Sequence, residues 1–503
     1  MSKKVKIIIG VVLALLLVVG GGSLFAFFSK VNSPKNSYLL SEQKTMEKFN
    51  DYLEKRYDNE FKFMEEMNDN SYQSKTSFSL DLSDDVIDSL ELPKSVVDAT
   101  KLETVVAHDS KDKKSQIALT PTVADSKVGT FEWDADADNQ YFKSPLFDDI
   151  FKVPNDKIKD TYEELLGESI DETQAGELNN DSLNLNTILG QTVSREDVKK
   201  VDKKYQEKLI NKLDDDNFSK EKEKVDIFGE EKELDKLTMK LSNKEVKETI
   251  VYVLEEAKKD KELKEVLANA QNDKDFDKSL KDMIKEAKDK KASEYPKVNS
   301  VIYVEDEQVV KRDLKLTQDD TTLRLHGTSK IEDDKLRVDY KFGDETKYND
   351  GTFEIEIKGE SKGKPSETVK DDYTIRVDGS DIESKLEFKN ENSHDGDKTS
   401  DEGTVKVSVD LDQFVLDFKS ERQTDLKNNS MKTNSNFSSD MDGSQVGVNV
   451  KDETKLKEKV KFDTKGAKNL NGISESEKED ILSEIEENFT KIAGDIIEKA
   501  EDK

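Results

Sequence analysis

The chain contains no cysteine, which excludes disulfide bonds and metal sites built from thiolates. Histidine is scarce, with three residues in 503, and none of them belongs to an HExxH zinc motif. The sequence also has no GxGxxG after an expected strand and no GxxxxGK, so nucleotide binding has no motif to support it. From these absences we expect no metal and no cofactor.

Basic residues are fewer than acidic ones: the chain has 81 Lys and Arg residues, 112 Asp and Glu residues and a formal net charge of −31. Binding to nucleic acid requires a clustered basic surface, which this balance argues against. It argues equally against polybasic attraction to anionic lipid. Only 33% of the residues are hydrophobic, which favours disorder, but the regular alternation described below predicts a folded, solvent-rich body.

One long hydrophobic run, from Ile7 to Phe28, contrasts with this composition. About 20 apolar residues in a helix span the hydrocarbon core of a bilayer, and Lys3, Lys4 and Lys6 before the run favour a cytoplasmic N-terminus. The run exceeds the usual signal-peptide length and lacks a small-x-small cleavage site. We therefore predict an uncleaved signal anchor that crosses the cell membrane once, with the body extracellular. A cleaved signal peptide is the alternative.

Two regions of strand-like alternation flank a helical block. Alternation begins near Thr76 and returns more clearly from Val298, while Ser242 and Glu245 predict a capping box at the start of a helix in the block between. The polar stretches 391–403 and 421–443 are predicted to be loops. We expect the following divisions: 1–30, cytoplasmic tip and transmembrane anchor; 31–75, juxtamembrane helix; 76–297, antiparallel strands followed by the helical block; 298–465, antiparallel β-meander; 466–503, C-terminal amphipathic helix.

These elements predict an α+β fold, in which an N-terminal transmembrane helix precedes one or two curved antiparallel sheets packed with amphipathic helices. The second strand region should have one apolar face and one face of Lys, Glu and Asp. The last helix should cover an open sheet face with an apolar stripe. Its residues are Ile481, Leu482, Ile485, Phe489, Ile492 and Ile496.

A calcium site is suggested by Asp134, Asp136 and Asp138, which have the 1, 3, 5 spacing of a calcium-binding loop. The pattern then fails, because Asn139 stands where glycine is required and Pro145 where the bidentate glutamate should be. A solvated acidic hairpin is the favoured interpretation.

Serine–lysine pairs and histidines complete the chemical candidates. The Ser-x-x-Lys pattern of penicillin-interacting enzymes occurs three times, at Ser41-x-x-Lys44, Ser110-x-x-Lys113 and Ser361-x-x-Lys364. Lysine is abundant enough to produce such matches by chance, and the accompanying KTG and SDN motifs are missing. The three histidines are expected outside helices, with His108 on a strand, His326 beside a turn and His394 in a polar loop, so no helix pairs any of them with a carboxylate. We therefore single out no catalytic, cofactor-binding or metal-binding residue, and expect that the protein is not an enzyme.

Two segments carry a resemblance to known families. They are FEWDADADNQYFKSPLF, a strand–turn–strand, and KLTMKLSNKEVKETIVYVLEEAKKD, a strand that runs into a capped helix. The arrangement resembles the half-barrel of the LolA/LppX-type envelope proteins, and it is similar to uncharacterised membrane-anchored proteins of Gram-positive bacteria (the DUF6583 type). LolA and LppX carry a cleaved signal or a lipid anchor, which this chain lacks. The resemblance implies an apolar cavity for an acyl chain or another hydrophobic partner.

The expected function is therefore that of a non-enzymatic, single-pass envelope protein whose extracytoplasmic body binds a hydrophobic ligand or a protein partner. A structural or assembly role in a cell-surface complex is the first alternative. An enzyme acting on a wall polymer is the second alternative, since glycosidases use a pair of carboxylates and this sequence has many. For the same reason no particular pair can be singled out.

Overall fold

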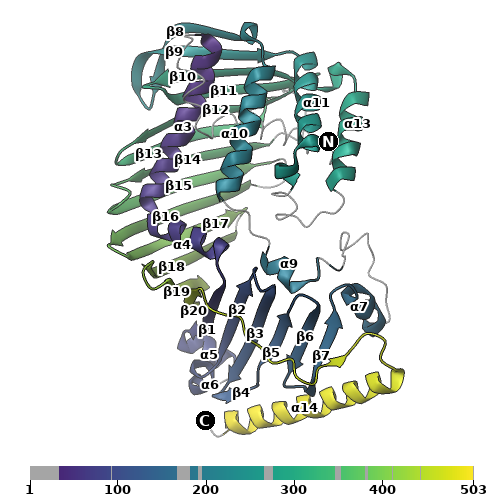
Figure 1. Ribbon diagram of the computed structural model, residues 1–503. Helices are drawn as coiled ribbons and strands as arrows, with labels where there is room; N and C mark the ends of the chain where they lie inside the picture. The colour runs from purple at the N-terminus through teal and green to yellow at the C-terminus, as the bar shows by residue number, and fades with distance from the viewer. Residues whose placement is uncertain are drawn as a thin grey trace.

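Strand β1 (Tyr72–Leu82) lies inside one large sheet, because it pairs with two strands that are far apart in the sequence (Figure 1). Its neighbours are β2 (Lys101–Asp109) and β20 (Ser444–Leu456). In this computed structural model, these pairings join 21 strands of the described chain into a single sheet. The structure describes residues 33–91, 93–166, 180, 182–190, 195–264, 276–345, 353–379, 383–410, 412–441 and 443–501.

The chain builds the sheet outward from β1 and then returns to it. It first runs from β1 toward one end of the sheet, where β7 pairs with β6 and, in parallel, with β21. The strands of this part are β3 (Lys114–Val123), β4 (Ser126–Lys127), β5 (Phe131–Ala135), β6 (Asn139–Ser144), β7 (Phe147–Pro154) and β21 (Lys468–Asn469).

The second part begins at the opposite end of the sheet, at β8, and is an antiparallel meander in which each strand pairs with the next until β20 meets β1. Its strands are β8 (Phe218–Ile227), β9 (Glu230–Leu241), β10 (Lys297–Glu305), β11 (Gln308–Gln318), β12 (Thr321–Glu332), β13 (Lys335–Asp344), β14 (Glu354–Lys362), β15 (Thr368–Asp378), β16 (Glu383–Asp395), β17 (Lys398–Val409), β18 (Asp412–Asp425) and β19 (Ser430–Met441).

Helices lie against one face of the sheet, which we call the helix face. Helices α3 (Pro34–Arg56) and α4 (Asp58–Asp69) cross the strands of the meander. Helix α10 (Arg195–Lys212) runs alongside α3, and α11 (Asn243–Lys259) and α13 (Phe276–Asp289) lie on its far side (Figure 1). The largest buried cluster lies here, between these helices and β8–β11. The other helical segments are α5 (Asp84–Ser89), α6 (Lys94–Asp98), α7 (Ile158–Leu166), α9 (Leu185–Gly190), α14 (Glu475–Glu501) and the short 3₁₀ turns Asp215–Asn217 and Ala292–Glu294.

The predicted fold class needs correction. The described chain is mostly β and contains one sheet, because β20 pairs with β1 and so connects strand regions that the sequence separates by a helical block. No helix in the described part of the chain has the length and apolar character needed to cross a bilayer. The predicted span from Ile7 to Phe28 lies outside the described residues, so the corrected fold class contains no transmembrane helix.

The two polar stretches predicted to be loops are also corrected. Residues 391–403 form the hairpin between β16 and β17, and residues 421–443 contain the end of β18 and all of β19. Two other predictions are confirmed: Ser242 and Glu245 form a capping box at α11, and a C-terminal helix is present, although it begins at Glu475 within the predicted division 466–503. The predicted division of the second strand region into an apolar and a charged face is confirmed by the register, as shown below.

Candidate functional site

Helices α3 and α4 are fastened to the helix face at several points along their length. Near the start of α3, the Glu42 carboxylate accepts two hydrogen bonds, of 2.6 and 2.5 Å, from the Arg312 guanidinium on β11. The Thr45 hydroxyl accepts a hydrogen bond of 2.7 Å from the backbone N–H of Val309. On α4, Phe63 is fully buried against Tyr72 on β1. These contacts hold the two helices in place along one side of the helix face.

The end of α3 is held by a buried polar cluster that we call the Arg56 cluster: Arg56, Ser361, Asp371, Asn390, Asn392 and Asp401. Arg56 donates two hydrogen bonds to Asp371, of 3.0 and 2.5 Å, and a third of 3.1 Å to Asn392. Burial lowers the pKa of the Arg56 guanidinium, but the hydrogen bonds that it donates to Asp371 outweigh this effect, and the pKa lies above its ordinary value. Removing either ion would leave the other charge buried without its partner.

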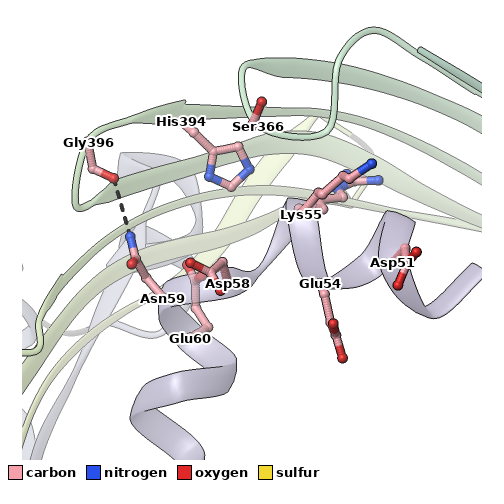
Figure 2. A pocket seen from close by; sticks show the side chains of 10 residues that line it. Asp51, Glu54, Lys55, Asp58, Asn59, Glu60, Ser366, His394 and Gly396 are labelled. Atoms are coloured by element: carbon pink, nitrogen blue, oxygen red, sulfur yellow. Dashed lines mark hydrogen bonds between the residues drawn. The ribbon is translucent and has the colours of Figure 1, made fainter. Parts of the chain in front are cut away.

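A polar pocket of about 430 Å³ lies beside this cluster, at the break between α3 and α4 (Figure 2). Its lining residues are Asp51, Glu54, Lys55, Arg56, Asp58, Asn59, Glu60, Ser366, His394 and Gly396. Both ring nitrogens of His394 have partners, at 2.9 Å from Asn392 and 3.3 Å from Thr399, and burial lowers the pKa of the ring. Asn59 donates to the backbone carbonyl of Gly396. These contacts join α4 to the β16–β17 turn.

A serine–histidine pair occurs elsewhere, which the sequence spacing did not reveal. The Ser115 hydroxyl lies 2.8 Å from Nδ1 of His108 and donates a 2.6 Å hydrogen bond to Asn186. Ser115 has no exposed surface and His108 is 7% exposed, so a substrate in solution has no access to the pair. The arrangement fixes α9 to β2 and β3.

The three aspartates of the calcium-like spacing do not converge on one point. Asp134 is buried, forms an ion pair of 2.9 Å with Lys143 and accepts a hydrogen bond from Gln116; burial raises its pKa to about 6. Asp136 instead accepts hydrogen bonds from the turn backbone at Asp138 and Asn139. The segment is the hairpin between β5 and β6, and no group of three potential ligands gathers within the residues that the structure describes.

Two of the three Ser-x-x-Lys serines have structural partners, and the third, Ser110, lies in the exposed turn between β2 and β3. The Ser41 hydroxyl donates to the backbone carbonyl of Ser37 within α3. Ser361 is buried and donates to Asp371 as part of the Arg56 cluster. His326 pairs across the strands with Lys341 on the face opposite the helices, and burial lowers its pKa.

An apolar surface that no helix of the described chain covers lies on the helix face beside α3 and α4. Residues that pair directly across strands point to the same face, so the register defines two straight rows. One row crosses β14 to β18 through Ile357, Ile375, Leu386, Val407 and Phe414. The other crosses β18 to β1 through Phe418, Phe437, Val448 and Leu80. We call these nine residues, with Val377 and Val409 beside them, the apolar band.

Much of the apolar band is exposed to solvent. The exposed fraction is 47% for Phe414, 44% for Leu80 and 41% for Val409, with Ile357, Val377 and Phe437 between 37 and 39%. The Phe418 ring lies over Gly403, where a side-chain Cβ would approach it to 2.8 Å, and stacks with Phe388 at a centroid distance of 6.1 Å. These contacts define the position of the Phe418 ring within the band.

The opposite face of the same strands is charged and internally paired. Lys341 pairs with Glu354 at 2.9 Å, Lys385 pairs with Glu387 at 2.7 Å, and Arg376 pairs with Glu356 at 3.4 Å. A face of alternating charges is suited to water. The contrast shows that the exposed apolar side chains belong to one face only.

Acidic residues lie at the strand ends beside the band, on both faces of the sheet: Glu354, Asp378 and Glu383 pair across the strands on the charged face, whereas Asp412 pairs with Val409 of the band. We call this set the acidic edge: Asp344, Glu345, Glu354, Asp378, Glu383, Asp410, Asp412 and Asp440. They lie at the four hairpin connections β13–β14, β15–β16, β17–β18 and β19–β20. The residues of these connections that the structure describes include no Lys or Arg. The turns at the other ends of these strands carry both signs, with Lys364, Lys398 and Lys427 among them.

No family model matches the chain, and neither does any curated protein. Two solved structures of OmpT, an outer membrane protein of Vibrio cholerae, share 7% identity with it. The loop L8 deletion mutant covers 76% of this chain and 98% of its own, with a TM-score of 0.19. The in-vitro folded trimer form covers 77% and 98%, with a TM-score of 0.16. At such TM-scores neither likeness supports an argument, and a location at the cell envelope stays a prediction.

Proposed function

We propose that the protein is a non-catalytic binding protein whose apolar band docks another protein. The observation that carries this proposal is the exposure of an ordered apolar surface on the one face of the sheet that helices cover elsewhere. Exposed apolar patches of this kind mark interaction sites in soluble proteins. The charged, paired opposite face gives no reason to expect a partner there.

The shape of the band favours a protein over a small hydrophobic ligand. Sites for small molecules enclose most of the ligand surface within a concave pocket. The band is instead spread over eight strands, β14 to β20 and β1, and its central side chain, Phe414, is 47% exposed. The pocket beside it is lined by charged and polar groups. An acyl chain would leave much of such a surface in water.

A non-catalytic role is supported by the positions of the histidines. His108 is buried with Ser115, and both ring nitrogens of His394 are engaged. The alternative of a structural component in a larger assembly is supported by α14, whose outward side chains Leu482, Phe489 and Ile497 are about 60% exposed. A docking band and an apolar terminal helix would give two contact surfaces.

Photo-crosslinking in the cells that produce the protein tests the proposal. A photoreactive phenylalanine analogue replaces Ile357 or Phe414 in the band, and the matched controls replace Arg376 or Lys406 on the charged face of the same strands. We expect both band positions to give an adduct with the same protein, because they lie in one row of the sheet. The control positions should not give it.

A second variant establishes that the adduct depends on the band. Phe437→Asp, in the neighbouring row, should abolish the adduct at position 414 while leaving the far-ultraviolet circular dichroism spectrum unchanged. An adduct with lipid alone would contradict a protein partner. Equal adducts from both faces, or none from the band, would contradict the proposal itself.

A further inference from the structure

Strands β5 and β6 hold the Lys143 ammonium group in contact with two carboxylates, those of Asp134 and Glu132. We propose that Lys143 and Asp134 condense to an intramolecular isopeptide bond, with Glu132 as the proton acceptor. Such a bond would crosslink the β5–β6 hairpin in a chain that has no cysteine for a disulfide. The modification is independent of the docking function proposed above.

The strand register brings the three side chains together. Glu132 pairs directly across the strands with Lys143, and Asp134 lies two residues farther along β5 on the same face. The Lys143 nitrogen Nζ is 2.9 Å from Oδ2 of Asp134 and 2.8 Å from Oε2 of Glu132. The nucleophile therefore touches both the carboxyl group that it would attack and the base that would take its proton, as a reaction between positioned groups requires.

Burial favours the protonated form of Asp134 that the reaction needs, because an amine attacks a carboxylic acid and not a carboxylate. The Asp134 side chain has no exposed surface, and that of Lys143 is 19% exposed. Burial raises the pKa of Asp134 to about 6, although the hydrogen bond from Lys143 acts against it. Transfer of one proton from Lys143 to Asp134 then gives a neutral amine beside a neutral acid, which a buried site tolerates better than two ions.

The neutral amine is the minor form of Lys143, which makes the condensation a slow, single event. Burial lowers the pKa of Lys143, but its hydrogen bonds to Glu132 and Asp134 outweigh this effect and raise the pKa above its ordinary value. A reaction that each chain undergoes only once can go to completion in spite of a small reactive fraction.

Gln116 on β3 supplies the remaining group. Its amide Nε2 donates a 2.9 Å hydrogen bond to Oδ1 of Asp134, whereas Lys143 contacts the other oxygen, Oδ2. A donor at Oδ1 stabilises the negative charge that develops on this oxygen when the amine adds to the carboxyl carbon. The Phe462 ring, whose centroid is 5.9 Å from Nζ of Lys143, adds an apolar neighbour to the site.

The reaction is a condensation that consumes no oxidant, reductant or other reagent. The lone pair of Nζ of Lys143 forms a bond to Cγ of Asp134, and Glu132 accepts a proton from the nitrogen of the adduct. Glu132 then returns this proton to the leaving hydroxyl group, the C–O bond breaks, and one water molecule departs. An amide between β5 and β6 remains, and Glu132 is again a carboxylate.

A second lysine–aspartate pair provides an internal control. Lys204 lies 2.8 Å from Asp260, and the Asp260 side chain is 3% exposed, but Lys204 is 38% exposed. Burial raises the pKa of Asp260, but the hydrogen bonds that it accepts outweigh this effect and the pKa lies below its ordinary value. Asp260 therefore stays ionised, and this pair should remain an ion pair.

Tryptic digestion and mass spectrometry of the full chain test the proposal. Trypsin cleaves after lysine only when the side chain is free, so we expect residues 128–152 to remain one peptide, uncut after Lys143 and one water molecule lighter than its sequence. Cleavage after Lys204 should be normal. Fragmentation of the peptide should place the branch between Asp134 and Lys143.

Three variants assign the roles. Asp134→Ala and Lys143→Arg should each give peptides of the mass expected from their sequence, with cleavage at position 143 in both. Glu132→Gln keeps Lys143 and Asp134 but removes the base, and should slow crosslinking roughly tenfold or more. Far-ultraviolet circular dichroism checks that each variant folds, and the wild-type digest decides the proposal without them.

The outcomes separate the bond from its alternatives. A wild-type peptide that is cut after Lys143 and has the mass of its sequence would overturn the proposal. Loss of water together with cleavage after Lys143 would indicate a succinimide at an aspartate, and would overturn it too. A crosslink that persists in Asp134→Ala would overturn the assignment of Asp134 as the acyl group.

Discussion

Arg56 anchors the end of α3 to the sheet through an ion pair with Asp371. Its charge is buried, and its carboxylate partner Asp371 is buried as well, with side-chain exposed fractions of 7% and 4%. Buried pairs of this kind contribute little net stability compared with an apolar pair, but breaking one is costly because the remaining charge is left unpaired. The position of α3 beside the apolar band therefore depends on both residues being present together.

This predicts that Arg56→Leu destabilises the docking of α3 by about 3 kcal/mol. Hydrogen exchange of the α3 and α4 backbone amides measures the effect directly. The double variant Arg56→Leu/Asp371→Leu should recover most of the loss, because no unpaired charge remains. Arg324→Leu, which breaks a partly exposed pair with Asp313, serves as control and should cost less than about 1 kcal/mol. Equal losses in the single and double variants would contradict this account.

His108 predicts a pH dependence of stability. Burial lowers its pKa below the ordinary value, and within the described chain its Nε2 has no hydrogen-bond partner. The unfolded chain therefore takes up a proton near pH 6.5 more readily than the folded chain, so this residue makes stability fall as the pH drops from about 7 toward 5.

Denaturant unfolding at pH 7.5 and 5.5 checks this expectation. His108→Asn keeps a polar group near Ser115 but does not titrate, so the variant should lose less stability than the wild type on acidification. A difference between variant and wild type that stays the same at both pH values would show that His108 does not titrate during unfolding.

At the scale of elements, helix α14 has an apolar stripe of which only a part packs against the sheet. The sequence stripe placed Leu482 and Phe489 on the covered side of the helix, but their exposed fractions are 60% and 63%. Ile485 and Ile492 are half-buried instead. A helical stripe about 100° wide predicts that one side is covered, but it does not predict which part of that side meets the sheet.

We therefore predict that Leu482→Ser/Phe489→Ser changes the free energy of unfolding by less than about 0.5 kcal/mol. Ile485→Ser/Ile492→Ser should cost at least about 2 kcal/mol, because these side chains pack inward. Thermal unfolding of the two double variants provides the comparison. If the outward pair proved as costly as the inward pair, α14 would be docked in another orientation.

The strands show where alternation succeeds as a predictor. It identified the meander from β10 onward because Leu, Ile, Val and Phe alternate there with charged residues. It failed at residues 391–403 because the helix face beneath α4 is polar, with Asn392, Thr399 and Asp401 in the positions that apolar residues occupy elsewhere. Polar residues on both faces remove the period on which such a prediction depends.

At the scale of the whole molecule, the pairing of β1 with β20 makes the two strand regions one sheet, and sequence periodicity could not predict this pairing. The pairing of β1 with β20 joins Tyr72 to Leu456 across more than 380 residues, and nothing local in either strand specifies that partner. The sheet that results exposes an apolar band which two separate sheets need not have had. The face asymmetry was predictable from the sequence, but the absence of a covering helix over the band in the described chain was not.

A docking function requires that the apolar band be open in the isolated protein and covered when a partner docks. Because the chain has no native cysteine, single cysteines placed at Ile357, Phe414 or Phe437 report this through their rates of thiol labelling, with Lys406→Cys on the charged face and Ile302→Cys in the core as references. We predict that the band positions react nearly as fast as position 406 in the purified protein, and that only they slow down in the crosslinked complex. Band cysteines that react as slowly as position 302 in the purified protein would show that the chain covers this surface itself, and would contradict the account.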